Sequence, residues 1–276
     1  MVAAHEIFQQ PFPVKLVWDS IPTPKHYRGY PDGTSLPDTI QVWQVQRPAE
    51  TPNPGLVSDG FGFTDSPDCE FIAGGVSTKG PNAVAIGRQA NWLLWGFSAP
   101  PSEMTDSARK VFLNAVVYMK RFDGARPLVV DPVGARGWAA TFAIWYARRP
   151  DYGWASHSTQ CFTPRVLEGA EGDLTKLASF VEANLSWIRV EPGTKKFDLD
   201  TEAKALGVAN NDVALLDRCV TMLEKGDRAD LARTLLARYV DANPGTDAKS
   251  WRAWLDANRA RLYFTDRGGY RFRVRP

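Results

Sequence analysis

The sequence predicts a mixed α/β or α+β protein, because two kinds of hydrophobic pattern divide the chain. Of its 20 prolines, 13 fall in residues 1–101, where they interrupt any long helix and separate short β-forming runs. From Thr105 onward, apolar residues instead recur at the helical period of 3.6. With 276 residues, 44% of them hydrophobic, the chain is long enough for one large domain or two small ones, each with a buried core.

Strands are expected in the first hundred residues, wherever apolar or alternating runs lie between prolines and glycines. These runs lie at residues 14–18, 39–46, 70–73, 83–86 and 91–97. The run from Trp92 to Trp95 is apolar on both faces, which predicts a central strand. The segment Gly74–Gly80 lacks the residue order of a Walker phosphate loop, because Lys79 precedes its last glycine and Pro81 follows it. We expect its glycines to let the backbone approach a neighbouring strand.

A helix is expected at residues 105–122, with one continuous apolar stripe that needs a sheet to cover. A second, aromatic-rich helix is expected at residues 138–147, where the aromatic side chains serve either the core or a sugar-stacking surface. Because the first helix completes the preceding sheet, we expect a β-rich domain over residues 1–150. A connector at 151–170 would join it to a helical module at 171–276.

The helical module is expected to consist of short capped helices, which begin near Asp173, Asn211, Asp227 and Thr246. At the end of the chain, Tyr270, Phe272 and Val274 alternate with arginines. This alternation predicts a short C-terminal strand or hairpin whose outer face carries the arginines.

Composition excludes several classes of protein. The net charge is +2 and the basic residues are interleaved with acidic ones, so no nucleic-acid-binding surface is expected. No apolar run reaches the ~20 residues that span a bilayer, and the N-terminus lacks the layout of a signal peptide. We therefore expect a soluble protein and leave its compartment open. The three cysteines are far apart, so neither a disulfide framework nor a zinc site is expected, and Cys219 is expected to be buried.

Ser98, His157, Cys161 and Asp65 are the candidate catalytic residues. Ser98 lies in Gly96–Pro100, which approaches the G-x-S-x-G nucleophile elbow but ends in proline, so an ordinary loop is the alternative. His157 and Cys161 are four residues apart, a spacing that permits a Cys–His dyad on a helix, although the flanking Gly, Ser and Pro residues favour a loop.

Asp65, Asp68 and Glu70 place three carboxylates within six residues. Such a cluster suits a hard divalent cation, although it lacks the glycine turn and spacing of an EF-hand loop. A solvated acidic loop is the alternative. No organic cofactor is expected.

Residues 84–124 contain Val-Ala-Ile-Gly-Arg-Gln, then Trp-Leu-Leu-Trp-Gly-Phe-Ser, Met-Thr-Asp-Ser-Ala-Arg and Phe-Leu-Asn-Ala-Val-Val-Tyr-Met. This segment resembles the closing strand and helix of ThuA-like domains. The resemblance implies the three-layer α/β fold of the class I glutamine amidotransferase-like superfamily and a link with carbohydrate use. The chain as a whole is similar to bacterial proteins that end in Trp-Arg-Ala-Trp-Leu followed by Asn-Arg-Ala-Arg-Leu.

The chain departs from an active amidotransferase, because it has neither a G-x-C-x-G elbow nor a later His-Glu pair, and Phe97 occupies a position that is often polar. Two functions follow as hypotheses. The first is a non-catalytic or degenerate amidotransferase-like domain that binds a carbohydrate or a protein partner. The alternative is a hydrolase of ester, lactone or glycosidic bonds, with a site drawn from the serine, histidine, cysteine and carboxylates named above.

Overall fold

The computed structural model describes residues 4–46, 56–130, 133–148 and 154–276. It has the expected mixed class: the protein is an α+β protein with small sheets whose paired strands are antiparallel. The chain forms two compact units. Unit 1 comprises Met1–Thr64 and Asp68–Leu128, and unit 2 comprises Asp65–Pro67 and Val129–Pro276.

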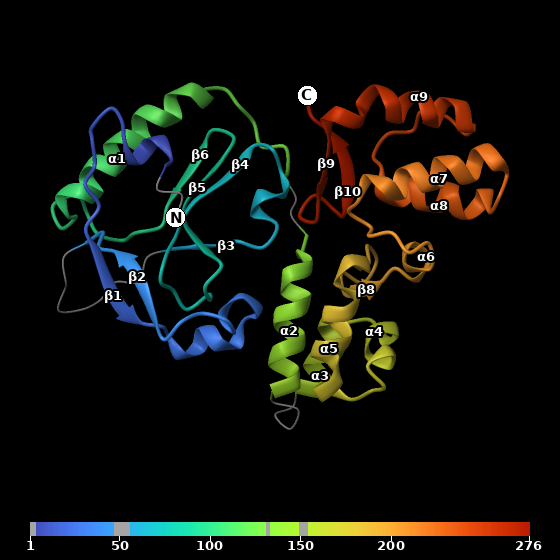
Figure 1. Cartoon of the computed structure of the whole chain (residues 1–276), viewed down its shortest axis with the longest axis horizontal. Helices are drawn as coiled ribbons and strands as arrows, with labels where there is room; N and C mark the ends of the chain where they lie inside the picture. The colour runs from blue at the N-terminus through green and yellow to red at the C-terminus, as the bar shows by residue number, and fades with distance from the viewer. Residues whose placement is uncertain (1–3, 47–55, 131–132, 149–153) are drawn as a thin grey trace. The chain divides into compact units, whose positions relative to one another are not determined.

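The main sheet of unit 1 is built around β5 (Ala83–Gln89) (Figure 1). This strand pairs with β3 (Ser58–Asp59), β4 (Cys69–Gly74) and β6 (Trp92–Trp95). The expectation that residues 92–95 form the central strand is therefore wrong. The strand β6 pairs with β5 alone, and Trp92 is 69% exposed, so an apolar run on both faces did not require burial on both faces here.

The helix α1 (Asp106–Met119) covers this sheet, as its apolar stripe predicted (Figure 1). Thr105 caps its first turn by accepting the N–H of Ala108 at 3.3 Å. Ala108, Val111 and Ala115 are fully buried and join the side chains of β4 and β5 in one core. The resemblance to ThuA-like domains implies helices on both faces of a sheet, but α1 is the one α-helix in the described residues of unit 1.

Two further strands of unit 1, β1 (Trp18–Pro22) and β2 (Thr39–Trp43), form a separate ladder. Of the strand expected at residues 14–18, only Trp18 belongs to β1. Val14 and Leu16 pack against the core without joining a sheet. The remaining elements are 3-10 turns: Glu6–Phe8, Lys25–Gly29, Pro31–Gly33, Phe63–Asp65 (at the join of the units) and Lys120–Phe122.

The Gly74–Gly80 loop brings the backbone close to neighbouring elements, as expected. A Cβ atom at Gly75 would lie 2.7 Å from the Cβ of Ala85 on β5. Gly80 has a φ of +93°, and a Cβ there would lie 2.7 Å from the ring of Tyr30. Both positions therefore favour glycine for steric reasons.

Unit 2 begins before the expected connector. The helix α2 (Arg136–Arg148) packs along α5 (Leu174–Asn184), so the two units divide between residues 128 and 129 and not at 151–170. Residues 149–153 lie outside the described part of the chain. The rest of the expected connector folds as α3 (Trp154–Cys161) and α4 (Pro164–Gly169).

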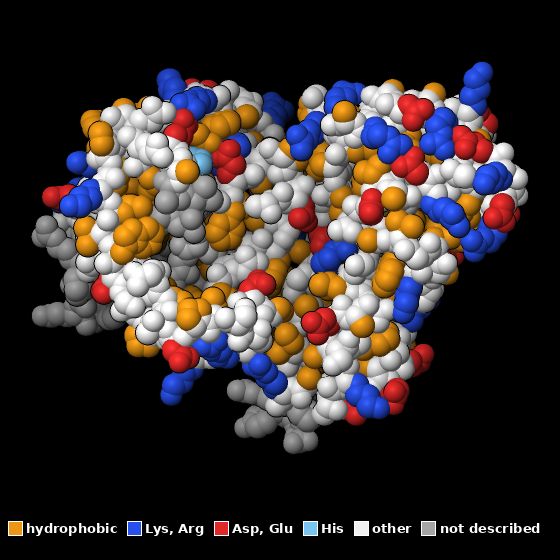
Figure 2. Space-filling view, viewed as in Figure 1, with side chains coloured by type: hydrophobic (Ala, Val, Ile, Leu, Met, Phe, Trp, Pro, Cys, Tyr) orange, Lys and Arg blue, Asp and Glu red, His pale blue; other side chains and the backbone are white. Residues whose placement is uncertain are grey.

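The short helices expected over residues 171–276 are present in unit 2, but the first of them, α5, packs against α2 in a core of its own. The others are α6 (Thr201–Ala205), α7 (Val213–Lys225), α8 (Ala229–Tyr239) and α9 (Ala248–Asn258). Asp173, Asp212 and Asp247 cap α5, α7 and α9, so the expected starts are correct to within about two residues. On the face seen in Figure 2, Lys and Arg side chains are interleaved with Asp and Glu over α7–α9. No helix in the described ranges is long and apolar enough to cross a bilayer.

Two hairpins complete unit 2: β7 (Ile188–Val190) with β8 (Phe197–Leu199), and β9 (Leu262–Thr265) with β10 (Arg271–Val274). The second is the expected C-terminal hairpin. Phe272 is buried in the core, whereas Arg271 and Arg273 on the other face form ion pairs with Asp241. Two 3-10 turns, Leu185–Trp187 and Arg259–Arg261, lead into β7 and β9.

Candidate functional site

An aromatic cavity of about 460 Å³ lies in unit 2, between α2, α3 and the β7–β8 hairpin. We call it the aromatic cavity, because four of its nine lining residues are aromatic. It is lined by Trp138, Phe142, Trp145, Phe197, Cys161, Gln160, Val190, Lys195 and Gly134. Its volume lies within the usual range for small-molecule sites. The polar side chains of Gln160 and Lys195 lie among the apolar ones.

The spacing of residues on α2 gives this helix two apolar faces. Trp138, Phe142 and Trp145 lie three and four residues apart, so they share the face that lines the cavity. The ring centroids of Trp138 and Phe142 are 5.3 Å apart, and those of Phe142 and Trp145 are 5.6 Å apart. Ala139 and Tyr146 are instead buried in the core. The core hypothesis is thus confirmed for Tyr146, and Trp138 and Phe142 pack against the same core while they line the cavity.

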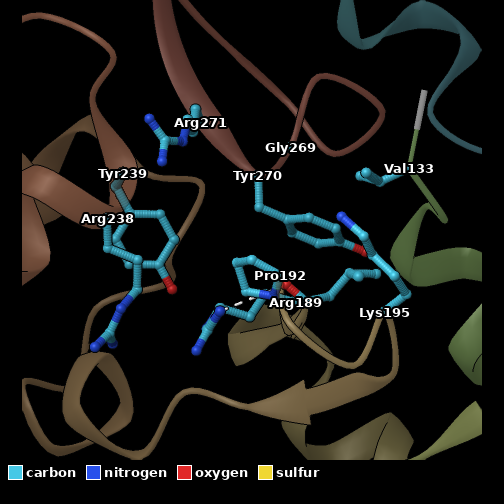
Figure 3. A pocket seen from close by; sticks show the side chains of 10 residues that line it. Val133, Arg189, Pro192, Lys195, Arg238, Tyr239, Gly269, Tyr270 and Arg271 are labelled. Carbon is cyan, nitrogen blue, oxygen red and sulfur yellow. Dashed lines mark hydrogen bonds between the residues drawn. The ribbon is translucent and has the colours of Figure 1, made fainter. Parts of the chain in front are cut away.

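A second cavity, of about 400 Å³, lies in the same unit, and we call it the cationic cavity. Four cationic side chains line it with two tyrosines: Arg189, Lys195, Arg238, Arg271, Tyr239 and Tyr270. Figure 3 shows Lys195 and Val133 on one side of this cavity, Arg238 and Arg271 on the other, and Tyr270 and Arg189 between them. Val190 and Lys195 line both cavities, so the two are neighbours.

Lys195 is positioned by the tight turn between β7 and β8. Its backbone has a φ of +60°, and its N–H donates to the Glu191 carbonyl at 2.8 Å. The Glu191 carboxylate accepts the N–H groups of Thr194 at 2.5 Å and Gly193 at 3.0 Å, and these bonds lower its pKa to about 2. The side chain of Lys195 is exposed and makes no ion pair with any residue that the structure describes.

Asp200 does not line the cationic cavity itself, but its carboxylate binds two residues that do. Its fully buried carboxylate accepts hydrogen bonds from Arg238 and from the Tyr239 hydroxyl, both at 2.6 Å, and caps α6 at Ala203. Burial on its own would raise the pKa of Asp200, but these hydrogen bonds outweigh it, so the pKa is lowered and the group is charged. The shared carboxylate holds Arg238 and Tyr239 at the cavity wall.

Arg189 and Arg271 keep hydrogen-bonding capacity within the same cavity. The Arg189 Nε lies 3.6 Å from Asp200 and has no hydrogen-bond acceptor among the described residues. Arg271 shares the Asp241 carboxylate with Arg273, at 2.6 and 3.1 Å. A carboxylate that serves two arginines leaves donors unused, so this wall can bind an anion.

Tyr270 joins the two cavities. It is buried, has a φ of +58°, and donates its hydroxyl hydrogen bond to the carbonyl of Gly134 at 2.8 Å. Gly134 lines the aromatic cavity, whereas Tyr270 lines the cationic one. Burial, and then the charge of Asp266, raises the pKa of Tyr270, so its hydroxyl stays protonated and remains a donor.

The carboxylates of Asp65, Asp68 and Glu70 do not form the expected metal site. No cluster of three or more His, Cys, Asp or Glu side chains that could hold a metal ion occurs in the described ranges. Each carboxylate has a protein partner of its own. Asp65 accepts the N–H of Asp266 at 3.2 Å, and Asp68 accepts that of Leu128 at 2.9 Å. Burial, together with the charge of Asp266, raises the pKa of Asp65.

Glu70 lies at the centre of a charged cluster in unit 1. It accepts hydrogen bonds from Arg88 at 2.9 Å and Tyr118 at 2.5 Å, and His5 lies 3.7 Å away. His5, Arg88 and Tyr118 together outweigh burial and hold the pKa of Glu70 well below its usual range. Burial and the bond to Glu70 raise the pKa of Tyr118 to about 12. These contacts join β4, β5 and α1, which is a structural role.

The candidate catalytic residues are divided between the units. Ser98 is in unit 1, where residues 96–100 lead into a turn and α1 starts only at Asp106, so the strand-to-helix elbow is not formed. His157 and Cys161 lie on α3, a helix and not the expected loop. His157 is exposed, and the Cys161 thiol accepts a hydrogen bond from the Tyr146 hydroxyl at 3.1 Å. Of these residues, Cys161 lines the aromatic cavity.

Sequence reasoning did not find the four cations that line the cationic cavity. They are separated by up to 82 positions and carry no motif, because they come from β7, the β7–β8 turn, α8 and β10. The alternating tail, which contains Arg271, was the one available signal, and it was interpreted only as the outer face of a strand. For the aromatic cavity, the helical spacing of the aromatic residues on α2 is a signal that the sequence does contain.

Searches against protein-family models, curated proteins and solved structures found no match to this chain.

Proposed function

We propose that this protein binds a carbohydrate, without chemical change to it, in the aromatic cavity of unit 2. The observation that carries the proposal is that Trp138, Phe142 and Trp145 present three neighbouring rings to one concave cavity. The C–H face of a sugar ring is apolar and packs on aromatic rings, which carry negative charge on their faces. The proposal stands without the resemblance to ThuA-like domains.

The polar groups of the aromatic cavity complement the hydroxyls of a sugar. The Gln160 side chain supplies both donors and an acceptor, and the Lys195 ammonium supplies donors only. A few polar groups that fix orientation among apolar walls are typical of small-molecule sites. A concave wall also favours a saccharide over a protein partner, the other ligand expected from the sequence, because protein partners bury broader surfaces.

The test is a titration of the intact protein with a panel of trisaccharides, followed by tryptophan fluorescence and calorimetry. We expect the variant Trp145→Ala to weaken binding at least tenfold, because one stacking ring is removed. Trp92→Ala is the matched control, since Trp92 is an exposed residue of β6 in unit 1. If no saccharide binds, or if both variants bind as the unchanged protein does, the proposal is wrong.

One observation favours the alternative, a hydrolase. Cys161 lies in the wall of the same cavity and receives the Tyr146 hydroxyl hydrogen bond. A thiolate at this position would be the nucleophile, and Tyr146 would donate to it. Turnover of chromogenic esters, lactones or glycosides that is lost in Cys161→Ser would support a hydrolase. Turnover that persists in this variant, or no turnover at all, would remove Cys161 from consideration.

A further inference from the structure

We propose that the carbohydrate is acidic, and that its carboxylate or sulfate group binds in the cationic cavity while its ring stacks in the aromatic cavity. This inference rests on the proposed function, and it adds the chemical class of the ligand. Its basis is that Lys195 and Val190 line both cavities, so a ligand that fills the aromatic cavity has the cationic cavity directly beside it.

Lys195 is suited to meet the anionic group first. Its side chain is exposed, it lines both cavities, and none of the described residues forms an ion pair with it. The turn around Glu191 fixes its backbone, so its flexible side chain starts from a defined position beside both cavities. A charge-assisted hydrogen bond from a lysine without a carboxylate partner gains more than one from a lysine that must first break an ion pair.

Further donors lie deeper in the cationic cavity. The Arg189 Nε is buried and has no acceptor among the residues that the structure describes, although its guanidinium lies within 3.6–3.9 Å of Asp198 and Asp200. Arg271 has donors beyond the bond that it makes to Asp241. Arg189 on β7 and Arg271 on β10 therefore add cationic groups to the wall of this cavity, with Arg271 on the side opposite Lys195 (Figure 3).

The carboxylates near the cavity do not cancel this preference. Asp198, Asp200, Glu202 and Asp241 pair with its arginines but are absent from its lining, so cationic groups are what a ligand meets. Asp200 is buried, and hydrogen bonds hold its pKa below the usual range.

The experiment compares matched acidic and neutral saccharides on the intact protein. The probes are trigalacturonic acid and its methyl ester, together with a sulfated galactose trisaccharide and its unsulfated form. We expect the acidic member of a pair to bind about tenfold more tightly than its neutral match, with an advantage that shrinks as salt is added. The pair with the larger difference identifies the group as a carboxylate or a sulfate ester.

Two lysine variants localise the effect. Lys195→Gln should abolish the tenfold advantage of the acidic probe and leave the affinity for the neutral probe within about twofold. Lys196→Gln is the matched control, because it removes the same charge from the adjacent position, which lines neither cavity. Equal losses in the two variants would indicate non-specific attraction and overturn the inference.

The remaining outcomes separate this inference from the proposed function. If acidic and neutral probes bind equally and Trp145→Ala weakens both, the inference is wrong and carbohydrate binding stands. If Lys195→Gln weakens the acidic probes but Trp145→Ala does not, the cavity binds anions without stacking, and both proposals are wrong. If no probe of either kind binds, both are also wrong.

Discussion

The Asn114 side chain binds both the N–H and the carbonyl of Phe12, which lies 102 residues earlier in the sequence. The Asn114 Oδ1 accepts the N–H of Phe12, and its Nδ2 donates to the Phe12 carbonyl, each at 2.9 Å. The same Nδ2 also donates to the carbonyl of Ile7 at 2.9 Å. One fully buried amide of α1 therefore fixes the N-terminal segment of unit 1.

Asn114→Ala should lower the free energy of unfolding by roughly 2–3 kcal/mol, because it leaves buried backbone groups without partners. Hydrogen exchange should increase most at residues 7–12. Asn91→Ala, an exposed position in the same unit, is the control and should change stability by less than about 0.5 kcal/mol. Unchanged exchange at Phe12 would show that the side chain does not hold this segment.

Glu70 should make unit 1 sensitive to acid. Its pKa in the folded protein is below the unfolded value of about 4.3, so its stabilising effect is complete above that pH and is lost as the pH falls further. Glu70→Gln should cost ~1 kcal/mol at pH 7, because the neutral amide replaces the charged partner of Arg88, and should cost little at pH 2.

The measurement for Glu70 is denaturant unfolding of both proteins between pH 2 and pH 7. Glu103→Gln removes the same charge from an exposed position of unit 1 and serves as control. The free energy of unfolding is compared between the unchanged protein and Glu70→Gln. If the difference is the same at every pH, the Glu70 carboxylate is not the cause of the acid sensitivity.

Asp266→Asn should strongly destabilise unit 2. Asp266 binds the Arg136 guanidinium with both carboxylate oxygens, at 2.7–3.0 Å, and both side chains are largely buried. A buried guanidinium without its counter-charge costs about 3–5 kcal/mol. Asp241→Asn is the matched control, because its partners Arg271 and Arg273 are more exposed, and it should cost less than ~1 kcal/mol. Thermal unfolding measures both, and equal shifts would contradict the prediction.

Cys219 should be unreactive in the folded protein. It is fully buried in the core of the helical module, and burial raises the pKa of its thiol to about 12. In the variant Cys69→Ser/Cys161→Ser, a thiol reagent should label Cys219 only at the rate of unfolding. The variant that keeps Cys161 alone should react faster, since Cys161 is half-buried. Rapid labelling of Cys219 in native buffer would show that this core opens.

The elements that could be predicted from the sequence are those whose signals are local. The stripe of α1, the capping Asp173 of α5 and the alternating tail each encode their structure within a few residues. Burial of Cys219 followed from its helical position in the same way. The position of β6 could not be predicted, because an apolar run does not indicate which strands pair with it.

The candidate site could be predicted only in part, for the same reason. Aromatic residues at helical spacing indicated that α2 carries a ring surface, and tertiary packing decided which rings line the cavity and which join the core. Asp65, Asp68 and Glu70 are neighbours in sequence, yet each has a different partner in the fold. Closeness along the chain did not produce a shared site.

The sequence by itself determined a mixed class with both helices and strands, most helices, the C-terminal hairpin and the ring surface on α2. Only the tertiary structure decided where the chain divides and that Arg189, Lys195, Arg238 and Arg271 meet beside those rings. The physical reason is the distance along the chain over which each interaction acts. Caps, periodicity and alternation act over a few residues, whereas a cavity forms where distant elements pack, and its position depends on the packing of the entire unit.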